Sequence, residues 1–497
     1  MSERANGLDR LAFPWAIACA TGLEYFDSAL FSFFASYIAG GVNASPDELV
    51  WAATAYGSAA VLGIVQQQWW VDRLGYRRYL TLFLLGYALG AVGAALCQSS
   101  LELAVARAWQ GYCIGPLMGA CRILIQECFP GERRAGAIRS FLVMILLGSA
   151  VAPLAGSVLL DHAQWRALFA CTAPAALLFA AAVWLSVPHV GALQVTERGE
   201  AHVWPYLLFA GGQAALQIVM QQLRFNLFTG SPLPLAMTLA GCAALAWFGY
   251  HQWHHPRPLM RLDALRERSY RTGLVLYGLY YFLATSLSYL MPRFMEGGLG
   301  WPVTRTGQLI GLTSLTSLAL LFGYLRVSRH ITRKKLLIVP GFVCAATIAL
   351  WFASMSPQVG ERALLGALLL RSLLILMIVL PVANLTFRPF AGEAFSHGYR
   401  IKNVLKQLTI SFSTASVIVL EQHRTALHHA RLAEMASPYN PVFEQAMTRI
   451  GGAAPLAQIA GMVSRQSAFM ASLDAFLFVA AVALSGAVYA LLQRQIK

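Results

Sequence analysis

Two carboxylates, Glu24 and Asp27, lie in the first long apolar run of the chain. Their spacing of three residues places both on one face of a helix. Acidic groups this close in a medium of low dielectric repel each other, which favours retention of a proton by one of them. Such a group could carry protons reversibly across a membrane. The alternative is a structural pair held by arginine or by backbone donors.

Three arginines, Arg107, Arg122 and Arg371, also fall inside apolar runs, where an ionisable side chain is first treated as functional. Arginine keeps its proton, so each needs a carboxylate, an anionic ligand or water. Arg122 follows Arg107 by fifteen residues, about four helical turns and nearly the same face, with Gln110 beside them. This pattern predicts a cavity that accepts anions. Arg122 could instead extend to the cytoplasmic interface, and Asp474 is expected at the outer interface.

Histidines cluster in HQWHH at 251–255 and at His428 and His429. No cysteine or carboxylate stands beside them at metal-ligand spacing, so we predict a solvated face and no metal site. The chain also has no GxxxxGK[ST], HExxH or GxSxG motif. ATP-driven transport by this chain alone is therefore disfavoured. A membrane enzyme would need a nucleophile or a metal set within a span, and we predict neither an enzyme nor a cofactor.

The composition places these groups in a membrane. Of the 497 residues, 58% are hydrophobic and 12% are charged, whereas soluble domains carry about 25% charged residues. No short apolar region with a small-residue cleavage site opens the chain, so we expect its first helix to remain as an anchor. Fourteen runs approach the roughly 20 residues that span a bilayer, at 13–39, 51–70, 79–97, 101–125, 138–160, 166–186, 204–222, 232–250, 271–291, 304–325, 336–354, 363–385, 402–420 and 468–491.

Basic residues determine the expected orientation. If the N-terminus is cytoplasmic, the cytoplasmic segments hold most of the 37 Lys and Arg residues, in line with the positive-inside rule. The net charge of +15 is therefore a topology signal, and we predict no nucleic-acid partner. Both termini should face the cytoplasm.

The predicted fold is an all-α integral membrane protein of fourteen transmembrane helices. Residues 1–190 should form one six-helix bundle, residues 191–268 an insertion of two helices with a cytoplasmic linker, and residues 269–497 a second, pseudo-symmetric six-helix bundle. Many transporters build a central site between such paired halves. The outer segment 421–467 is longer than a connection requires. Its stretch RTALHHARLAEM should form a short amphipathic helix across the outer mouth, ended by SPYNP.

Small residues recur in LLGSAVAPLAGSVL at 146–159, where Gly148, Ala152 and Gly156 are four apart and Pro153 lies among them. This spacing gives a helix a smooth face that another backbone can approach closely. Proline is tolerated in a membrane helix because neighbouring helices satisfy the freed carbonyl groups. We predict a kinked helix packed tightly on a partner; packing alone is the simpler role.

These motifs resemble the major facilitator superfamily, and within it the fourteen-helix drug:proton antiporters. WVDRLGYRR at 70–78 is similar to the family signature between helices two and three, although Gln68 and Trp70 depart from it. RAWQG at 107–111 is similar to the fourth-helix RxxQG motif, which implies a role in proton transfer. The matching signature residues, to which the resemblance assigns a conformational role, are Asp72, Arg73, Gly75 and Arg77.

Two further stretches extend the resemblance. GSAVAPLAG at 148–156 is similar to the antiporter motif, with Ala152 in place of a glycine, and implies export. Asp27 matches the first-helix aspartate of the branch, whereas Glu24 lies outside that pattern, and the second-half basic turn at 326–335 lacks the family's aspartate.

The outer segment RTALHHARLAEMASPYNP at 424–441 resembles that of EmrB-type inner-membrane permeases, which work with a periplasmic adaptor and an outer-membrane channel. The resemblance implies that this segment docks the adaptor. The docking residues would be Leu427, His428, His429, Leu432, Glu434, Pro438, Asn440 and Pro441.

The expected function is proton-coupled efflux of amphiphilic, toxic small molecules across the bacterial inner membrane by alternating access, in a tripartite pump. A dedicated exporter of an anionic metabolite, fatty acid or siderophore is the alternative in the same class. From another class, a transport-dead interaction protein would not need embedded carboxylates such as Glu24 and Asp27.

Overall fold

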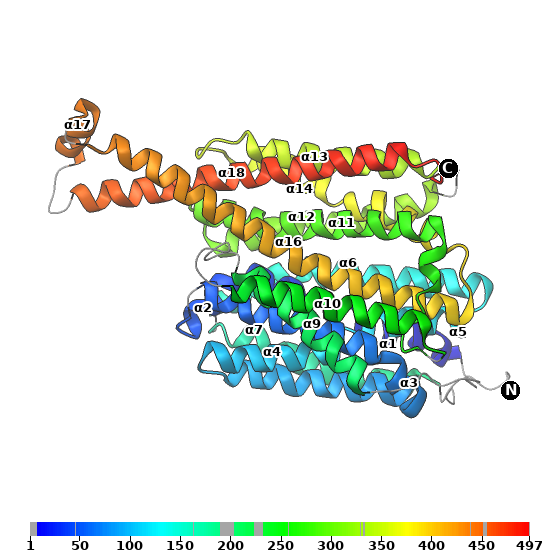
Figure 1. Ribbon diagram of the computed structural model, residues 1–497. Coiled ribbons are helices and arrows are strands. Elements are labelled where there is room, and N and C mark those ends of the chain that lie inside the picture. Colours follow the sequence, from blue (N-terminus) through cyan, green and yellow to red (C-terminus); the bar gives the residue numbers. More distant parts are fainter. Residues whose placement is uncertain are drawn as a thin grey trace.

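The computed structural model describes residues 7–44, 46–162, 164–188, 203–222, 232–256, 258–328, 330–331, 333–437, 439–450 and 455–496, and within these ranges it contains helices and no strand (Figure 1). The N-terminal helices are α1 (Gly7–Phe33), α2 (Ala35–Gly41), α3 (Pro46–Leu96), α4 (Ser100–Ile114), α5 (Leu117–Cys128), α6 (Gly131–His162), α7 (Ala167–Ala170), α8 (Thr172–Ser186), α9 (Val203–Gln222) and α10 (Leu233–His254). The C-terminal helices are α11 (Arg268–Arg293), α12 (Val303–Val327), α13 (Lys335–Ala353), α14 (Glu361–Arg371), α15 (Leu380–Phe387), α16 (Gly392–Met435), α17 (Pro441–Ile450) and α18 (Pro455–Leu492). Short 3₁₀ or π turns occupy Asp263–Arg266, Phe294–Gly298 and Ile375–Val379.

Eleven helical stretches in the described ranges are long and apolar enough to cross a membrane. One of them, α3, consists of two helices that meet at Gly75. Helix α1 has 27 residues, and α4 and α5 follow each other across Gly115 and Pro116 with 15 and 12 residues. The all-α, multi-pass fold is thereby confirmed, and the helices are consistent with fourteen crossings.

The turn inside α3 contains the WVDRLGYRR motif. Gly75 has φ 72° and ψ 158°, a backbone conformation that is essentially restricted to glycine. Beside it, Gln68 donates a hydrogen bond of 2.6 Å to Asp72, so Gln68, which replaces the family glycine, binds the motif aspartate. Arg73 stacks on Trp69 at 3.8 Å and Arg77 on Trp184 at 4.4 Å. The motif residues are thus held by local contacts on both sides of the glycine.

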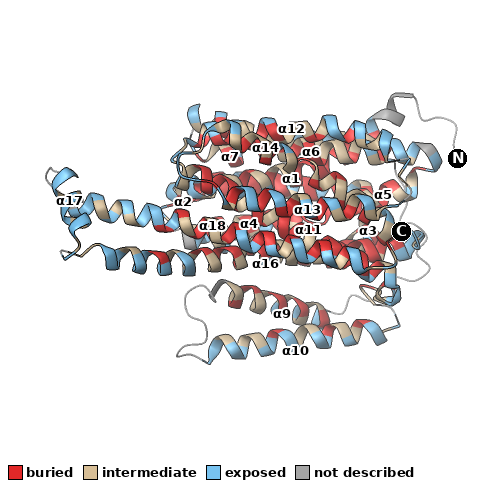
Figure 2. Cartoon of the chain, turned by 90° about the horizontal axis from the view of Figure 1, so that it is seen from above, coloured by how far each residue is buried: buried red, intermediate tan, exposed pale blue. Residues whose placement is uncertain are grey.

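The two largest of the apolar clusters in the described structure lie in different parts of the bundle. One consists mainly of residues from α1 to α8, and the other extends from α11 to α18. Helices α9 and α10 lie together on the outside (Figure 2). Gln213 of α9 donates a hydrogen bond of 3.2 Å to the Ser58 carbonyl of α3, and Ser58 donates one to Gln217. The predicted limits of the three domains remain a prediction.

Helix α16 extends far beyond the bundle. Its 44 residues are unbroken, so at 1.5 Å per residue it is about 66 Å long, roughly twice the hydrocarbon thickness. Together with α18 it forms a projection tipped by α17, at the opposite end of the molecule from both chain termini (Figure 1). At the base of this projection, the Asp474 carboxylate contacts the His428 ring at 2.8 Å and the Arg424 guanidinium at 3.3 Å.

The projection corrects the prediction of a short amphipathic helix across the outer mouth. RTALHHARLAEM instead continues α16, because residues 402–435 contain no glycine or proline that would end the helix. The predicted stop is confirmed, since α16 ends at Met435 and α17 begins at Pro441. Pro438 lies outside the described residues.

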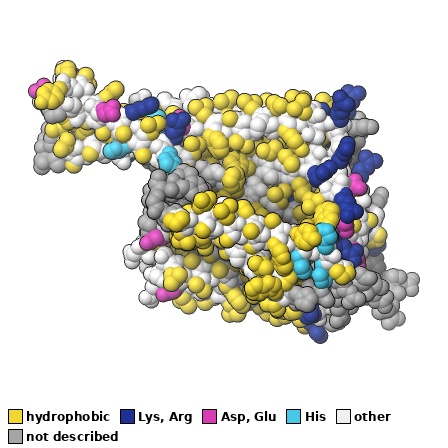
Figure 3. All heavy atoms as spheres, in the orientation of Figure 1, with side chains coloured by type: hydrophobic (Ala, Val, Ile, Leu, Met, Phe, Trp, Pro, Cys, Tyr) yellow, Lys and Arg dark blue, Asp and Glu magenta, His cyan; other side chains and the backbone are white. Residues whose placement is uncertain are grey.

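Charge is distributed unevenly over the surface. In Figure 3, Lys and Arg side chains gather at the end where the termini lie, and apolar side chains cover the body of the bundle. The orientation of this basic end relative to the membrane remains a prediction from the positive-inside rule.

Candidate transport cavity and its buried ion pairs

A cavity of about 1060 Å³ lies between the two halves, comparable to the larger small-molecule sites of proteins. Its wall combines aromatic rings, aliphatic side chains and charged groups. The charged residues that line it are Glu24, Arg107, Arg122, Arg293, Lys334, Arg388, Lys402, Lys406 and Glu421. Seven of these nine side chains are cationic.

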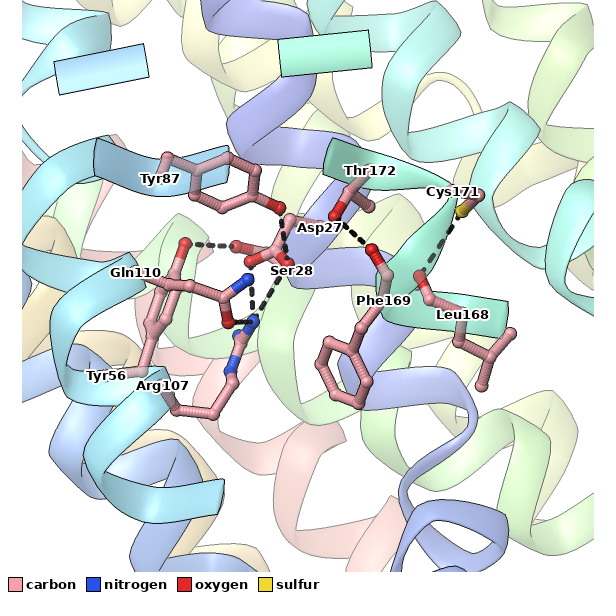
Figure 4. A network of polar contacts seen from close by, with 10 residues as sticks. All are labelled: Asp27, Ser28, Tyr56, Tyr87, Arg107, Gln110, Leu168, Phe169, Cys171 and Thr172. Atoms are coloured by element: carbon pink, nitrogen blue, oxygen red, sulfur yellow. Dashed lines mark hydrogen bonds and ion pairs between the residues drawn. The ribbon is translucent and has the colours of Figure 1, made fainter. Parts of the chain in front are cut away.

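One buried ion pair lies within the N-terminal half, between α1 and α4 (Figure 4). A guanidinium nitrogen of Arg107 contacts the two carboxylate oxygens of Asp27 at 2.8 and 3.0 Å. The same nitrogen donates to Gln110 at 2.9 Å, and Tyr87 donates its hydroxyl hydrogen to Asp27 at 2.9 Å. Asp27 is fully buried and Arg107 is 1% exposed. The arginine thus meets a carboxylate, as its place inside a span requires.

A second buried ion pair joins the two halves. Lys406 of α16 contacts Glu24 of α1 at 2.8 Å, and these side chains are 6% and 2% exposed. Lys406 also lies over the ring of Tyr25 at 4.6 Å. Since α1 and α16 belong to different halves, this pair must change if the halves move apart.

The two carboxylates share one side of α1, but each is bound to its own cation. Their directions differ by about 60°, which is enough for them to contact different helices. Asp27 therefore faces α3 and α4, whereas Glu24 faces α16, and each has its own cation. Lys402 and Lys406 do not stand out in the sequence, because they lie where the preceding loop enters the thirteenth apolar run. Both are buried.

The predicted cavity residues divide into two groups. Arg107 and Arg122 line the cavity, but they lie on separate helices because α4 ends at Ile114. Gln110 and Arg371 do not line it, which corrects the prediction. Gln110 holds Arg107, and Arg371 donates a hydrogen bond of 2.7 Å to Ser288, which does line the cavity.

The small residues of α6 face α1. A methyl group on Gly148 would overlap the carbonyl group of Gly22, and one on Gly156 would overlap the ring of Phe34. Ala152 between them is fully buried. The close helix contact predicted from these residues is therefore present.

The opposite side of α6 packs on α12 of the other half. A methyl group on Gly307 would lie 2.8 Å from the Pro153 carbonyl oxygen, and one on Gly311 would lie 3.0 Å from that of Ala150. Gly307 and Gly311 are four apart, so the same spacing rule could have identified them in the sequence. Helix α6 thus contacts both halves through small residues.

A further possibility for the described residues is metal binding. Within the described ranges, no group of three or more His, Cys, Asp and Glu side chains is placed to hold a metal ion. His428 instead contacts Asp474 at the base of the projection.

Two helical halves around a cavity, with ion pairs buried in and between them, define a multi-pass membrane transporter. The sequence profile of the Major Facilitator Superfamily matches residues 17–414. The chain belongs to this family.

Curated relatives of the chain are named as multidrug export or resistance proteins. It is 22% identical over 434 residues to the probable multidrug resistance protein EmrY of Escherichia coli K12, covering 86% of this chain and 83% of EmrY. It is 20% identical to the multidrug export protein EmrB of the same organism, covering 90% and 87%. It is also 20% identical to the fatty acid resistance protein FarB of Neisseria gonorrhoeae, covering 87% and 86%. These relatives confirm the resemblance to EmrB-type permeases.

Solved structures share the fold. A bacterial homologue of the human lysosomal transporter Spinster, inward-facing and occupied, has a TM-score of 0.63 at 12% identity, covering 99% of this chain and 98% of that chain. The xylose transporter XylE from E. coli has a TM-score of 0.60 at 12% identity, covering 97% of both chains.

Proposed function

We propose that this protein exports amphiphilic small molecules across the bacterial inner membrane in exchange for protons. The observation that carries the proposal is the cavity between the halves, together with Asp27–Arg107 and Glu24–Lys406. A carboxylate that alternately binds a proton and a cation can link proton movement to separation of the halves. The export function in the name of EmrB, and the resistance functions in the names of EmrY and FarB, support the direction of transport.

Inside-out membrane vesicles test this function, because export then appears as uptake into the lumen. With an acidic lumen, we expect accumulation of radiolabelled decanoate or of ethidium, two amphiphilic probes of opposite charge. Nigericin, which collapses the pH gradient, should abolish it, and vesicles without the protein serve as the control. Accumulation that is unchanged by nigericin, or absent for both probes, would contradict proton-coupled export.

We also propose that the projection docks a periplasmic adaptor that passes substrate toward an outer-membrane channel. The tip is exposed: Met435 and Val442 are 67% and 70% accessible, and Tyr439 is 96% accessible. Large exposed apolar side chains on a polar projection are typical of a protein-binding surface. The predicted docking residues Leu427, Leu432 and Glu434 lie on the outer part of α16.

Deletion of residues 427–441 is expected to abolish adaptor binding and to sensitise cells to toxic amphiphiles. The purified variant should still bind substrate, because the cavity lies within the bundle. Affinity co-purification with a periplasmic adaptor protein co-expressed with the permease measures docking. Deleting 444–449 within α17 is a comparison that leaves α16 intact. Undiminished co-purification after the first deletion would rule out docking by this segment.

A further inference from the structure

Lys402 is a buried basic residue whose ammonium group lies against aromatic rings. Its side chain lines the cavity and is 2% exposed. Among the described residues it forms no ion pair; its ammonium group lies over the rings of Tyr399 at 4.4 Å and Tyr277 at 5.3 Å. Ring faces attract a cation, but more weakly than a carboxylate does.

Arg122 reaches the same part of the cavity from α5. Its guanidinium lies over the ring of Phe395 at 5.1 Å, and its buried nitrogen Nη1 has no hydrogen-bond partner in the described structure. Arg122 is within electrostatic range of Lys402 and of the two tyrosines beside it. Two cations from different halves therefore converge on one aromatic corner.

The local charge is unbalanced. Three basic side chains, Lys402, Lys406 and Arg122, share this corner with the carboxylate of Glu24, which is bound to Lys406. Buried charges in proteins are normally paired, because removing them from water is costly. This corner of the cavity is thus complementary to an anion.

Apolar side chains continue the wall next to this corner. Met118 of α5 and the α6 residues Phe141, Leu142 and Ile145 all line the cavity. A ligand that satisfies both surfaces has an acidic group at one end and an apolar body.

We propose that Arg122 and Lys402 form a subsite for the carboxylate of an amphiphilic solute, whose apolar body lies along α6. The proposal rests on the proposed function, because it specifies the substrate class of the same cavity. It distinguishes a carboxylate exporter from an exporter that accepts amphiphiles irrespective of charge.

Equilibrium binding to the purified full-length protein tests the subsite without a proton gradient. The probes are decanoate and decanamide, which have the same chain and differ in charge at pH 7.5. In phosphatidylcholine nanodiscs, wild-type protein is expected to bind decanoate roughly tenfold more tightly than decanamide, or better. Equal affinities of the wild type for the two probes would overturn the proposal whatever the variants show.

Lys402→Gln and Arg122→Gln should each remove most of the preference for decanoate and leave decanamide affinity unchanged, which also reports an intact cavity. Lys402→Arg should retain the preference. Lys335→Gln is the matched control, because this lysine donates to backbone carbonyls of Leu491 and Gln493 and does not line the cavity. If both Gln variants keep the wild-type ratio, the subsite is refuted.

Two further measurements separate related explanations. Nanodiscs with added phosphatidylglycerol show whether an anionic lipid occupies the subsite. Displacement of decanoate, but not of decanamide, in both wild type and Lys402→Arg would assign the site to lipid and overturn the solute proposal. Charge-selective binding without gradient-driven uptake would refute proton-coupled export and leave the subsite supported. Gradient-driven uptake without charge-selective binding would support proton-coupled export and refute the subsite.

Discussion

Asp27→Asn is expected to reduce proton-driven transport to background while the protein still inserts in the membrane. Asparagine keeps the shape of the side chain but cannot exchange a proton. It also leaves Arg107, which is 1% exposed, without its counter-charge, a change that costs about 3–5 kcal/mol in comparable buried pairs. The measurement is decanoate uptake by inside-out vesicles with an acidic lumen, normalised to the amount of inserted protein.

Two comparisons make the Asp27 result specific. Asp27→Asn combined with Arg107→Gln removes the uncompensated charge, so restored folding without restored transport would separate stability from proton coupling. Glu24→Gln should reduce transport less, since Glu24 lies outside the family pattern, although it lines the cavity and binds Lys406. Wild-type uptake by Asp27→Asn and complete loss in Glu24→Gln would transfer the proton-carrier role to Glu24.

Gly156→Leu and Gly148→Leu are expected to stop turnover. Even a methyl group at these positions overlaps Phe34 or the Gly22 backbone, and the larger leucine side chain must force α6 away from α1. Overpacking of this kind typically costs about 1–3 kcal/mol, and it also disturbs the contact of α6 with α12. Transport should fall to background, whereas decanoate binding in one orientation could persist.

Gly323→Leu is the matched control for these variants. Gly323 lies in α12, and a methyl group there meets nothing within 4 Å. This variant should transport at a rate close to that of the wild type. Normal turnover in Gly156→Leu, measured in the same vesicles, would show that the close α1–α6 contact is not needed for the transport cycle.

The fold was largely predictable because each crossing helix must be apolar over roughly 20 residues. The exceptions are places where helices join or continue. Gly75 connects two helices at φ 72° and ψ 158°, a conformation essentially restricted to glycine, and it lies between the second and third predicted apolar runs. Composition alone does not predict that α16 continues beyond the bundle. Its polar stretch resembles a loop in composition, although no residue in it ends a helix.

The site was predictable only in part. Asp27 and Arg107 stand out because each is a charge deep within an apolar run, and the structure pairs them. The pairing of Glu24 with Lys406 joins residues 382 positions apart in the sequence, and no local spacing rule can reveal such a contact. Arg371 is the opposite case. Its position deep in an apolar run predicts a cavity residue, but its side chain does not line the cavity and instead donates a hydrogen bond to Ser288, which does.

The unbroken helix α16 connects the buried charges of the cavity to the tip of the projection. Lys402 and Lys406 lie toward the end of this helix that begins at Gly392, and Met435 lies at its far end. A tilt of only 5° about the Gly392 end would move the far end of a rod about 66 Å long by about 6 Å. Small rearrangements around the buried charges would therefore become large displacements at the tip of the projection.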